Sequence, residues 1–172
     1  MEPIDKSIKK LEIVIQWISN VDTKSSFVLA FYGIMTTIMF ASDIGNRIIN
    51  TLSYIPAQDI NGESIKLFIA LAIVILLLIS ILITFYFIFQ TLKGRLNPNV
   101  YQQHGLRTDS NLFFGTVASK SYSKFEEQTN AENDNDFRND VNSQVFINSN
   151  IVNRKFKLYN RSLIWLIISF LL

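Results

Sequence analysis

Three apolar blocks alternate with polar segments along the chain, at residues 25–42, 67–92 and 162–172. The first two blocks contain no charged residue. At 1.5 Å per residue, a helix over 25–42 would be about 27 Å long and one over Leu67–Phe89 about 34 Å, close to the roughly 30 Å of a bilayer's hydrocarbon core. A soluble domain of 172 residues could hardly bury both blocks. The pattern therefore predicts transmembrane helices over 25–42 and 67–92.

The third block, residues 162–172, has 11 uncharged residues. A helix of that length is about 16 Å long, which is too short to cross a bilayer alone. It is either a helix that enters the membrane, an interfacial anchor or a span cut short at this end. The sequence does not distinguish these three alternatives.

Lysine and arginine are spread unevenly over the polar segments. Residues 1–24 carry four of them, residues 43–66 two and residues 93–161 ten. Positively charged segments tend to stay on the cytoplasmic side of a membrane. We therefore expect 1–24 and 93–161 to be cytoplasmic, 43–66 to form a short outer loop, and the protein to be a multi-pass membrane protein.

The N-terminal segment 1–24 has the period of an amphipathic helix. Its apolar stripe consists of Ile4, Ile8, Leu11, Ile15 and Ile18. Such a helix either lies on the membrane surface or packs against protein. Protein packing is favoured here, because the polar face mixes both signs of charge. Asp22 is expected to be the N-cap of the first transmembrane helix, and Lys24 is expected to reach toward the lipid headgroups.

The segment 93–161 is predicted to be a helical sensor region. Gly94 and Pro98 are expected to end the second transmembrane helix. A helix over Val117–Thr129 is expected, then an acidic loop over Asn130–Asn139, then a longer helix from Asp136 that continues into 162–172. The predicted fold is an all-α membrane protein, with two transmembrane helices, a helical cytoplasmic domain and a short C-terminal apolar helix.

The composition argues against an enzyme. The chain has no cysteine and one histidine, His104, which lies in a polar segment without a ligand pattern, so no catalytic or metal site is expected. The two predicted spans contain no charged residue or histidine, unlike a transporter with a charged relay. The net charge of +2 is too small to argue for a nucleic-acid partner.

Three short motifs stand in a fixed order around the two spans. The first is a tryptophan followed by an Asp-x-Lys-small-small sequence at the start of the first span. The second is a Phe-Phe-Gly segment after the second span, and the third is Asp-x-x-x-Gln with a lysine eleven residues later. Their residues are Trp17, Asp22, Lys24, Asn111, Phe114, Gly115, Asp140, Gln144 and Lys155. In this order and spacing the chain resembles the Pycsar system effector family, the small transmembrane effectors of bacterial cyclic-pyrimidine anti-phage signalling.

The resemblance implies a function that composition and periodicity do not show. A pyrimidine nucleotide cyclase would make cyclic CMP (cCMP) or cyclic UMP (cUMP) on phage infection. The effector would bind that cyclic nucleotide and impair the bacterial inner membrane, so that the infected cell stops growing or dies. The implied partners are the lipid bilayer, the cyclic mononucleotide and further copies of the chain. No cofactor is implied.

A cyclic mononucleotide has one phosphate charge and one flat base, so its site needs cations and stacking groups. The candidate cations are Lys120, Lys124, Arg138, Arg154 and Lys155, and the candidate stacking residues are Phe113, Phe114 and Tyr122. Because 93–161 is small for a closed pocket, the site could lie between subunits. We expect the 136–161 helix to move on binding and to re-pack the spans. Small residues on the first span, Ala30, Gly33, Thr36 and Thr37, suit close helix contact.

Two alternatives remain open at this stage. A constitutive membrane scaffold would recruit a partner through the 1–24 and 136–161 helices and would not bind cyclic nucleotides. A small channel unrelated to nucleotides would conduct ions without any ligand.

Overall fold

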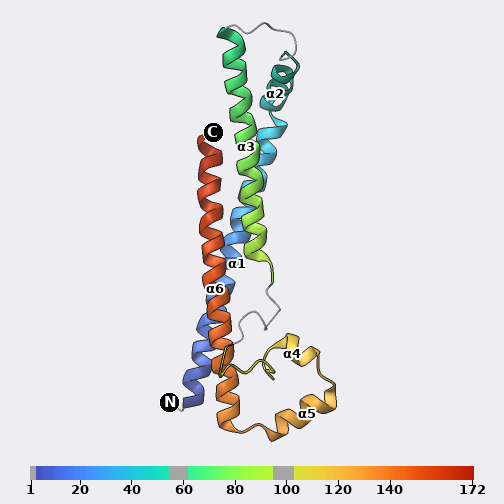
Figure 1. The fold of residues 1–172 in the computed structure, drawn as a ribbon, viewed down its shortest axis with the longest axis vertical. Coiled ribbons are helices and arrows are strands. Elements are labelled where there is room, and N and C mark those ends of the chain that lie inside the picture. Colours follow the sequence, from blue (N-terminus) through green and yellow to red (C-terminus); the bar gives the residue numbers. More distant parts are fainter. Residues whose placement is uncertain (1–2, 55–61, 95–102) are drawn as a thin grey trace. The chain divides into compact units, whose positions relative to one another are not determined.

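A computed structural model describes residues 3–54, 62–94 and 103–172 (Figure 1). These residues form helices and connecting segments, without a strand among them. The helices are α1 (Pro3–Ala41), α2 (Asp43–Tyr54), α3 (Gly62–Leu92), α4 (Phe114–Ala118), α5 (Tyr122–Ala131) and α6 (Asp134–Leu171). The all-α expectation is therefore confirmed.

The chain divides into two units, and two helices contribute to both. Residues Met1–Asp22 and Lys93–Phe156 form the first, which we call the polar unit. Residues Thr23–Leu92 and Lys157–Leu172 form the second, which we call the apolar unit. Each of the long helices α1 and α6 therefore begins in the polar unit and ends in the apolar unit.

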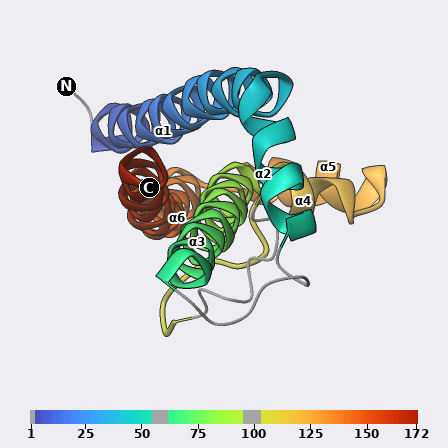
Figure 2. The same ribbon diagram turned by 90° about the horizontal axis from the view of Figure 1, so that it is seen from above.

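In the polar unit, the first part of α1 and the first part of α6 lie side by side (Figures 1 and 2). The buried or half-buried positions of α1 in this unit recur every three or four residues, at Ile4, Ser7, Leu11, Val14, Ile18 and Val21, with Ile8 and Asp22 half-buried beside them. The buried positions of α6 in this unit are Asp140, Val141, Ser143, Gln144, Ile147, Ile151 and Lys155. Alternating spacings of three and four are typical of helices that pack along a coiled-coil seam. The structure thus shows this face of α1 packed against protein, namely against α6.

Serine and asparagine side chains set the boundaries of α5 and α6. The Ser121 side chain accepts a hydrogen bond from the Lys124 amide and so caps α5 at its N-terminus. The Asn133 side chain accepts hydrogen bonds from the amides of Asn135 and Asp136, both at 3.0 Å, and so starts α6 at Asp134. The single helix expected over 117–129 is therefore wrong, because these caps split the region into α4 and α5. The expected acidic loop over 130–139 shrinks to two residues between α5 and α6.

In the apolar unit, α1, α3 and α6 meet around Tyr32, which is 3% exposed. The Tyr32 hydroxyl donates to the Ser169 hydroxyl of α6 at 2.7 Å. Its ring lies 5.4 Å from the ring of Phe85 on α3 and 6.3 Å from that of Phe170 on α6. Residues 162–171 thus continue α6 without a break, as expected, and pack against the other two helices.

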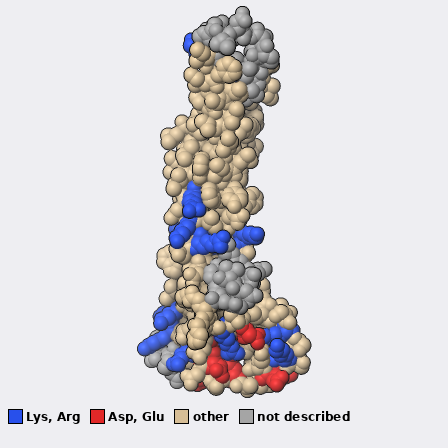
Figure 3. All heavy atoms as spheres, in the orientation of Figure 1, with Lys and Arg blue, Asp and Glu red and all other residues tan. Residues whose placement is uncertain are grey.

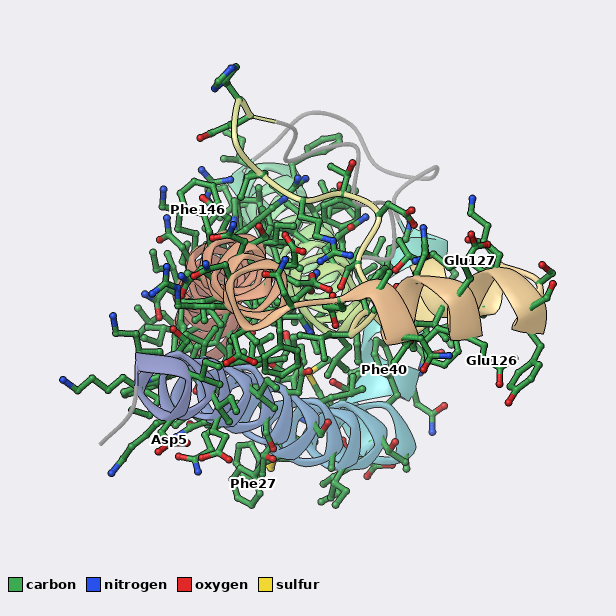
Figure 4. All side chains as sticks on the ribbon, turned by 90° about the horizontal axis from the view of Figure 1, so that it is seen from below. Asp5, Phe27, Phe40, Glu126, Glu127 and Phe146 are labelled. Carbon is green, nitrogen blue, oxygen red and sulfur yellow. The ribbon has the colours of Figure 1, made fainter. Side chains whose placement is uncertain are left out.

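The apolar unit buries several hydroxyl side chains and leaves many large apolar side chains exposed. On α3 the hydroxyl residues Ser80, Thr84 and Thr91 are buried, and each hydroxyl donates to a carbonyl of its own helix. Large apolar side chains instead point outward, such as Phe27, which is 73% exposed and projects away from α1 (Figure 4). Figure 3 shows this long surface without charged side chains along most of its length. Such a surface fits a lipid solvent and not water.

Two helices are long and apolar enough to cross a membrane, over Ile4–Ala41 and Phe68–Leu92. Their most apolar windows are only 11% and 17% buried, so they are not the core helices of a soluble domain. The expectation of an all-α membrane protein with two transmembrane helices is confirmed.

One local expectation needs correction. Asp22 does not cap a helix, because α1 runs unbroken from Pro3 to Ala41 and Asp22 lies inside it. In the segment 43–66, which is expected to be the outer loop, the described residues form α2 and the start of α3. The chain bends at Ser42, between α1 and α2, and Gly45 lies in the first turn of α2, where an added Cβ would lie 3.0 Å from the Phe40 carbonyl oxygen. Helix α3 ends at Leu92, just before Gly94, and Pro98 lies outside the described residues.

Candidate functional site

The first and third motifs meet in the polar unit. Lys155 of α6 forms an ion pair with Asp22 of α1, with 2.5 Å between Lys155 Nζ and Asp22 Oδ1. The Lys155 side chain is 5% exposed and that of Asp22 is 35% exposed. Next to this pair, the ring of Trp17 packs edge-on against Phe156 at 6.1 Å. The motif residues of two distant segments therefore form one contact between α1 and α6.

The second and third motifs also meet. Asp140 is fully buried, and its Oδ2 accepts a hydrogen bond of 2.8 Å from the Asn111 amide. Its other oxygen, Oδ1, is buried without a hydrogen-bond partner among the described residues. Gln144 lies one turn further along α6 and is also buried. A buried carboxylate with one unpaired oxygen is costly, so its presence calls for an explanation.

A tight turn holds Asn111 in place. The Ser110 hydroxyl accepts hydrogen bonds from the amides of Leu112 and Phe113, both at 3.0 Å. The Ser110 carbonyl accepts from the Thr116 hydroxyl at 2.5 Å, which fastens the turn to the start of α4. Ser110 is 1% exposed, so the turn is a fixed part of the polar unit.

Lys120 is held by acceptors of its own chain. Its ammonium group lies 2.8 Å from Asp109 Oδ1 and donates to Asn111 Oδ1, also at 2.8 Å. The Lys120 hydrogen bond and a second one from Gln128 lower the pKa of the Asp109 carboxyl below its usual value. Because the Lys120 side chain is 3% exposed, its charge is engaged inside the unit and not presented to solvent.

A third ion pair, together with two hydrogen bonds, ties the same segment to Glu132 and to α6. Arg107 lies 2.7 Å from Glu132, donates to the Asp136 carbonyl, and its amide donates to the Ser143 hydroxyl. Nothing in the sequence pattern pointed to Arg107 or Glu132. Neither belongs to one of the three motifs, and only the tertiary fold brings the two together.

The eight candidate ligand residues do not form one cluster. Phe113 and Phe114 are in contact, with ring centroids 4.9 Å apart. Phe114 and Tyr122 are 63% and 76% exposed, and so both are accessible for stacking. Lys124 and Arg154 are exposed and Arg138 is partly exposed, whereas Lys120 and Lys155 are buried in ion pairs. The accessible candidates are thus Phe114, Tyr122, Lys124, Arg138 and Arg154.

Gly115 is required by the ring that precedes it. A Cβ added at Gly115 would lie 2.6 Å from Cε1 and 3.1 Å from Cζ of Phe113. Gly115→Ala would therefore push this ring out of its contact with Phe114, and we expect a loss of about 1 kcal/mol in the free energy of unfolding. Thermal unfolding of the detergent-solubilised protein measures it. Gly33→Ala is the matched control, since its Cβ would meet no described atom within 4 Å and alanine favours a helix. Equal stability of the two variants would contradict the prediction.

Comparisons with known proteins match the chain over nearly its whole length. The family described as the Pycsar effector protein domain matches residues 7–172. The chain is 36% identical over 169 residues to the Pycsar effector protein GmPycTM of Gulbenkiania mobilis, a match that covers 96% of this chain and 86% of that protein. No solved structure matches. The match over nearly the whole length shows that the chain belongs to the Pycsar effector protein family.

Proposed function

We propose that this chain is a non-enzymatic anti-phage effector of the bacterial inner membrane. It senses cCMP or cUMP through the polar unit, which faces the cytoplasm together with the N-terminus. Binding impairs the membrane through the apolar unit, and the infected cell stops growing or dies. The source of the ligand is a pyrimidine nucleotide cyclase, and the active form contains several copies of the chain.

The observation that carries the proposal is that α1 and α6 are each shared by both units. Asp22 and Lys155 join these two helices at the end of the polar unit, since Asp22 is the last residue of α1 in that unit and Lys155 is the last but one of α6. A ligand changes a protein by binding one arrangement more tightly than another. A ligand that favours a different α1–α6 packing in the polar unit therefore acts on the same helices that build the apolar unit.

The exposed candidates supply the required chemistry. Phe114 and Tyr122 offer accessible rings for a pyrimidine base. Lys124, Arg138 and Arg154 offer cations for the single phosphate charge. Since these residues are dispersed over the surface of one copy, a complete site would need residues from two copies.

The test uses the full chain in proteoliposomes that hold a potassium gradient, with a potential-sensitive dye. We expect cCMP or cUMP to collapse the potential and cAMP and cGMP to leave it intact. Phe114→Ala with Tyr122→Ala should abolish the response, whereas Asn130→Ala, exposed on α5, should retain it. An intact potential with both pyrimidine nucleotides, despite correct insertion, would refute membrane impairment. A collapse without any nucleotide would instead support the channel alternative. A scaffold would show no shift in melting temperature with either nucleotide.

A further inference from the structure

Two unpaired polar side chains lie one turn apart on α6, in the third motif. Asp140 is fully buried and Gln144 is 7% exposed. Asp140 Oδ1 has no hydrogen-bond partner among the described residues, and the side-chain amide of Gln144 makes no hydrogen bond with them either. Residues four apart share one face of a helix. This face of α6 therefore brings together a carboxylate oxygen that accepts and an amide that both donates and accepts.

A neighbouring residue shows what a satisfied polar side chain looks like here. Ser143 is also buried, and its hydroxyl donates to the Asn139 carbonyl at 2.8 Å and accepts from the Arg107 amide at 3.0 Å. Burial of a polar group without such partners is unfavourable. Asp140 Oδ1 and the Gln144 amide are therefore suited to a molecule that brings its own donor and acceptor.

We propose that Asp140 and Gln144 bind the hydrogen-bonding edge of a pyrimidine base. This inference rests on the proposed function and names the part of the nucleotide that α6 recognises. Cytosine carries the N4 amino donor next to the N3 acceptor, and uracil carries the N3–H donor next to the O4 acceptor. In both cases Asp140 Oδ1 accepts from the base and Gln144 Nε2 donates to it, as proteins read the same edge of unpaired bases in RNA.

The aromatic pair lies close to this part of α6 along the chain. The Asn111 amide donates to Asp140 Oδ2 at 2.8 Å, and the turn that contains Asn111 leads directly into Phe113 and Phe114. The segment before α4 runs beside α6 at this point (Figure 1). Phe114, which is 63% exposed, can thus stack on a base whose edge reaches Asp140 and Gln144.

Asp140 Oδ1 is enclosed, so the residues that cover it have to move before a base can reach it. Helices α4 and α5 follow the Asn111 turn and have no buried residue, so they can shift without opening a core. Entry of the base and movement of this segment are then one event, which links the second and third motifs. An enclosed site of this kind favours the one-ring pyrimidines over the larger purines.

The first experiment measures binding of cCMP and cUMP to the full chain in detergent by isothermal titration calorimetry. Gln144→Leu should weaken binding by about tenfold, because it removes the donor to the base. Folding is retained, since leucine fills a similar volume and removes an unpaired amide. Asn142→Leu is the matched control, because Asn142 is exposed on α6 between the two residues, and it should keep the full affinity.

The outcomes separate this inference from the proposed function. Unchanged affinity in Gln144→Leu, with binding by the unsubstituted chain, would overturn the base site alone, as expected if a buried water bridged the two side chains. Absence of binding of both nucleotides to the unsubstituted chain would overturn the proposed function, and the base site with it.

The second experiment tests the hydrogen bond to Asp140 with methylated nucleotides. N4,N4-dimethyl-cCMP and N3-methyl-cUMP lack the N–H that Asp140 Oδ1 would accept, so each should bind the unsubstituted chain about tenfold more weakly than its parent. In Asp140→Asn the remaining oxygen keeps the Asn111 amide, and the new NH₂ group takes the place of Oδ1. This variant should lose affinity for the parent nucleotides and show little further loss on methylation. Additive losses would mean that the methyl groups act by their bulk elsewhere and would refute the contact.

Discussion

Asp22→Ala is expected to lower the free energy of unfolding by about 3 kcal/mol. The Lys155 side chain is 5% exposed and forms an ion pair with Asp22, so the substitution leaves a buried cation without a counter-ion. Chemical unfolding in detergent, followed by tryptophan fluorescence, measures the change. Trp17 is a suitable reporter, because it contacts Phe156, the residue after Lys155.

The partner substitution provides the control. Lys155→Met should cost less than Asp22→Ala, because the Asp22 side chain that remains is 35% exposed and water can solvate it. The double variant should recover most of the loss, since methionine fills a similar volume and no charge is then left unpaired. Additive losses in the double variant would show that the two side chains do not act as a pair.

Asp140→Asn is expected to raise the free energy of unfolding by about 1–3 kcal/mol. The substitution keeps an oxygen that can accept the hydrogen bond from the Asn111 amide. It removes a negative charge from a fully buried side chain whose Oδ1 has no partner in the described part of the chain. Thermal and chemical unfolding measure the gain. The response to cCMP or cUMP in proteoliposomes should fall at the same time, if the carboxylate is retained for function at a cost in stability.

Asp140→Ala distinguishes the two roles of the carboxylate. It removes the acceptor and leaves the Asn111 amide unpaired, so it should be less stable than the unsubstituted protein by about 2 kcal/mol. If Asp140→Asn were as destabilising as Asp140→Ala, the negative charge of Asp140 would have to be stabilised by an interaction that the structure does not show. A stabilised asparagine variant with a full nucleotide response would show that the carboxylate is not used in signalling.

The sequence predicted the helices of this fold better than the contacts between them. The apolar blocks at 25–42 and 67–92 and the continuity of α6 could be read from local patterns, because lipid exposure and helical period are local properties. The partner of Asp22 could not be read from local patterns. Asp22 stands where a polar segment gives way to an apolar one, which is also where an N-cap is expected. Its partner Lys155 lies 133 residues away. Only the packing of α1 against α6 shows that Asp22 forms an ion pair and does not cap a helix.

The candidate site shows the same limit. The motif residues Asn111 and Asp140 were identified, but their hydrogen bond and the burial of Lys120 were not, because composition does not reveal which cations are enclosed. The break between α4 and α5 was missed for a different reason. Ser119, Ser121 and Ser123 alternate with other residues in one short stretch, and any of these serines could have capped a helix.

The buried hydroxyls of α3 have a consequence for how the apolar unit can move. Ser80, Thr84 and Thr91 line the protein-facing side of the helix, yet each donates to a carbonyl within three or four residues of itself. Hydrogen bonds of this kind travel with the helix. If α3 slides or turns against its neighbours, these three groups break no bond and expose no unsatisfied donor to lipid. At these positions α3 can therefore move against its neighbours without losing a hydrogen bond between helices, so the membrane part of the protein can change its packing at little cost in hydrogen bonding.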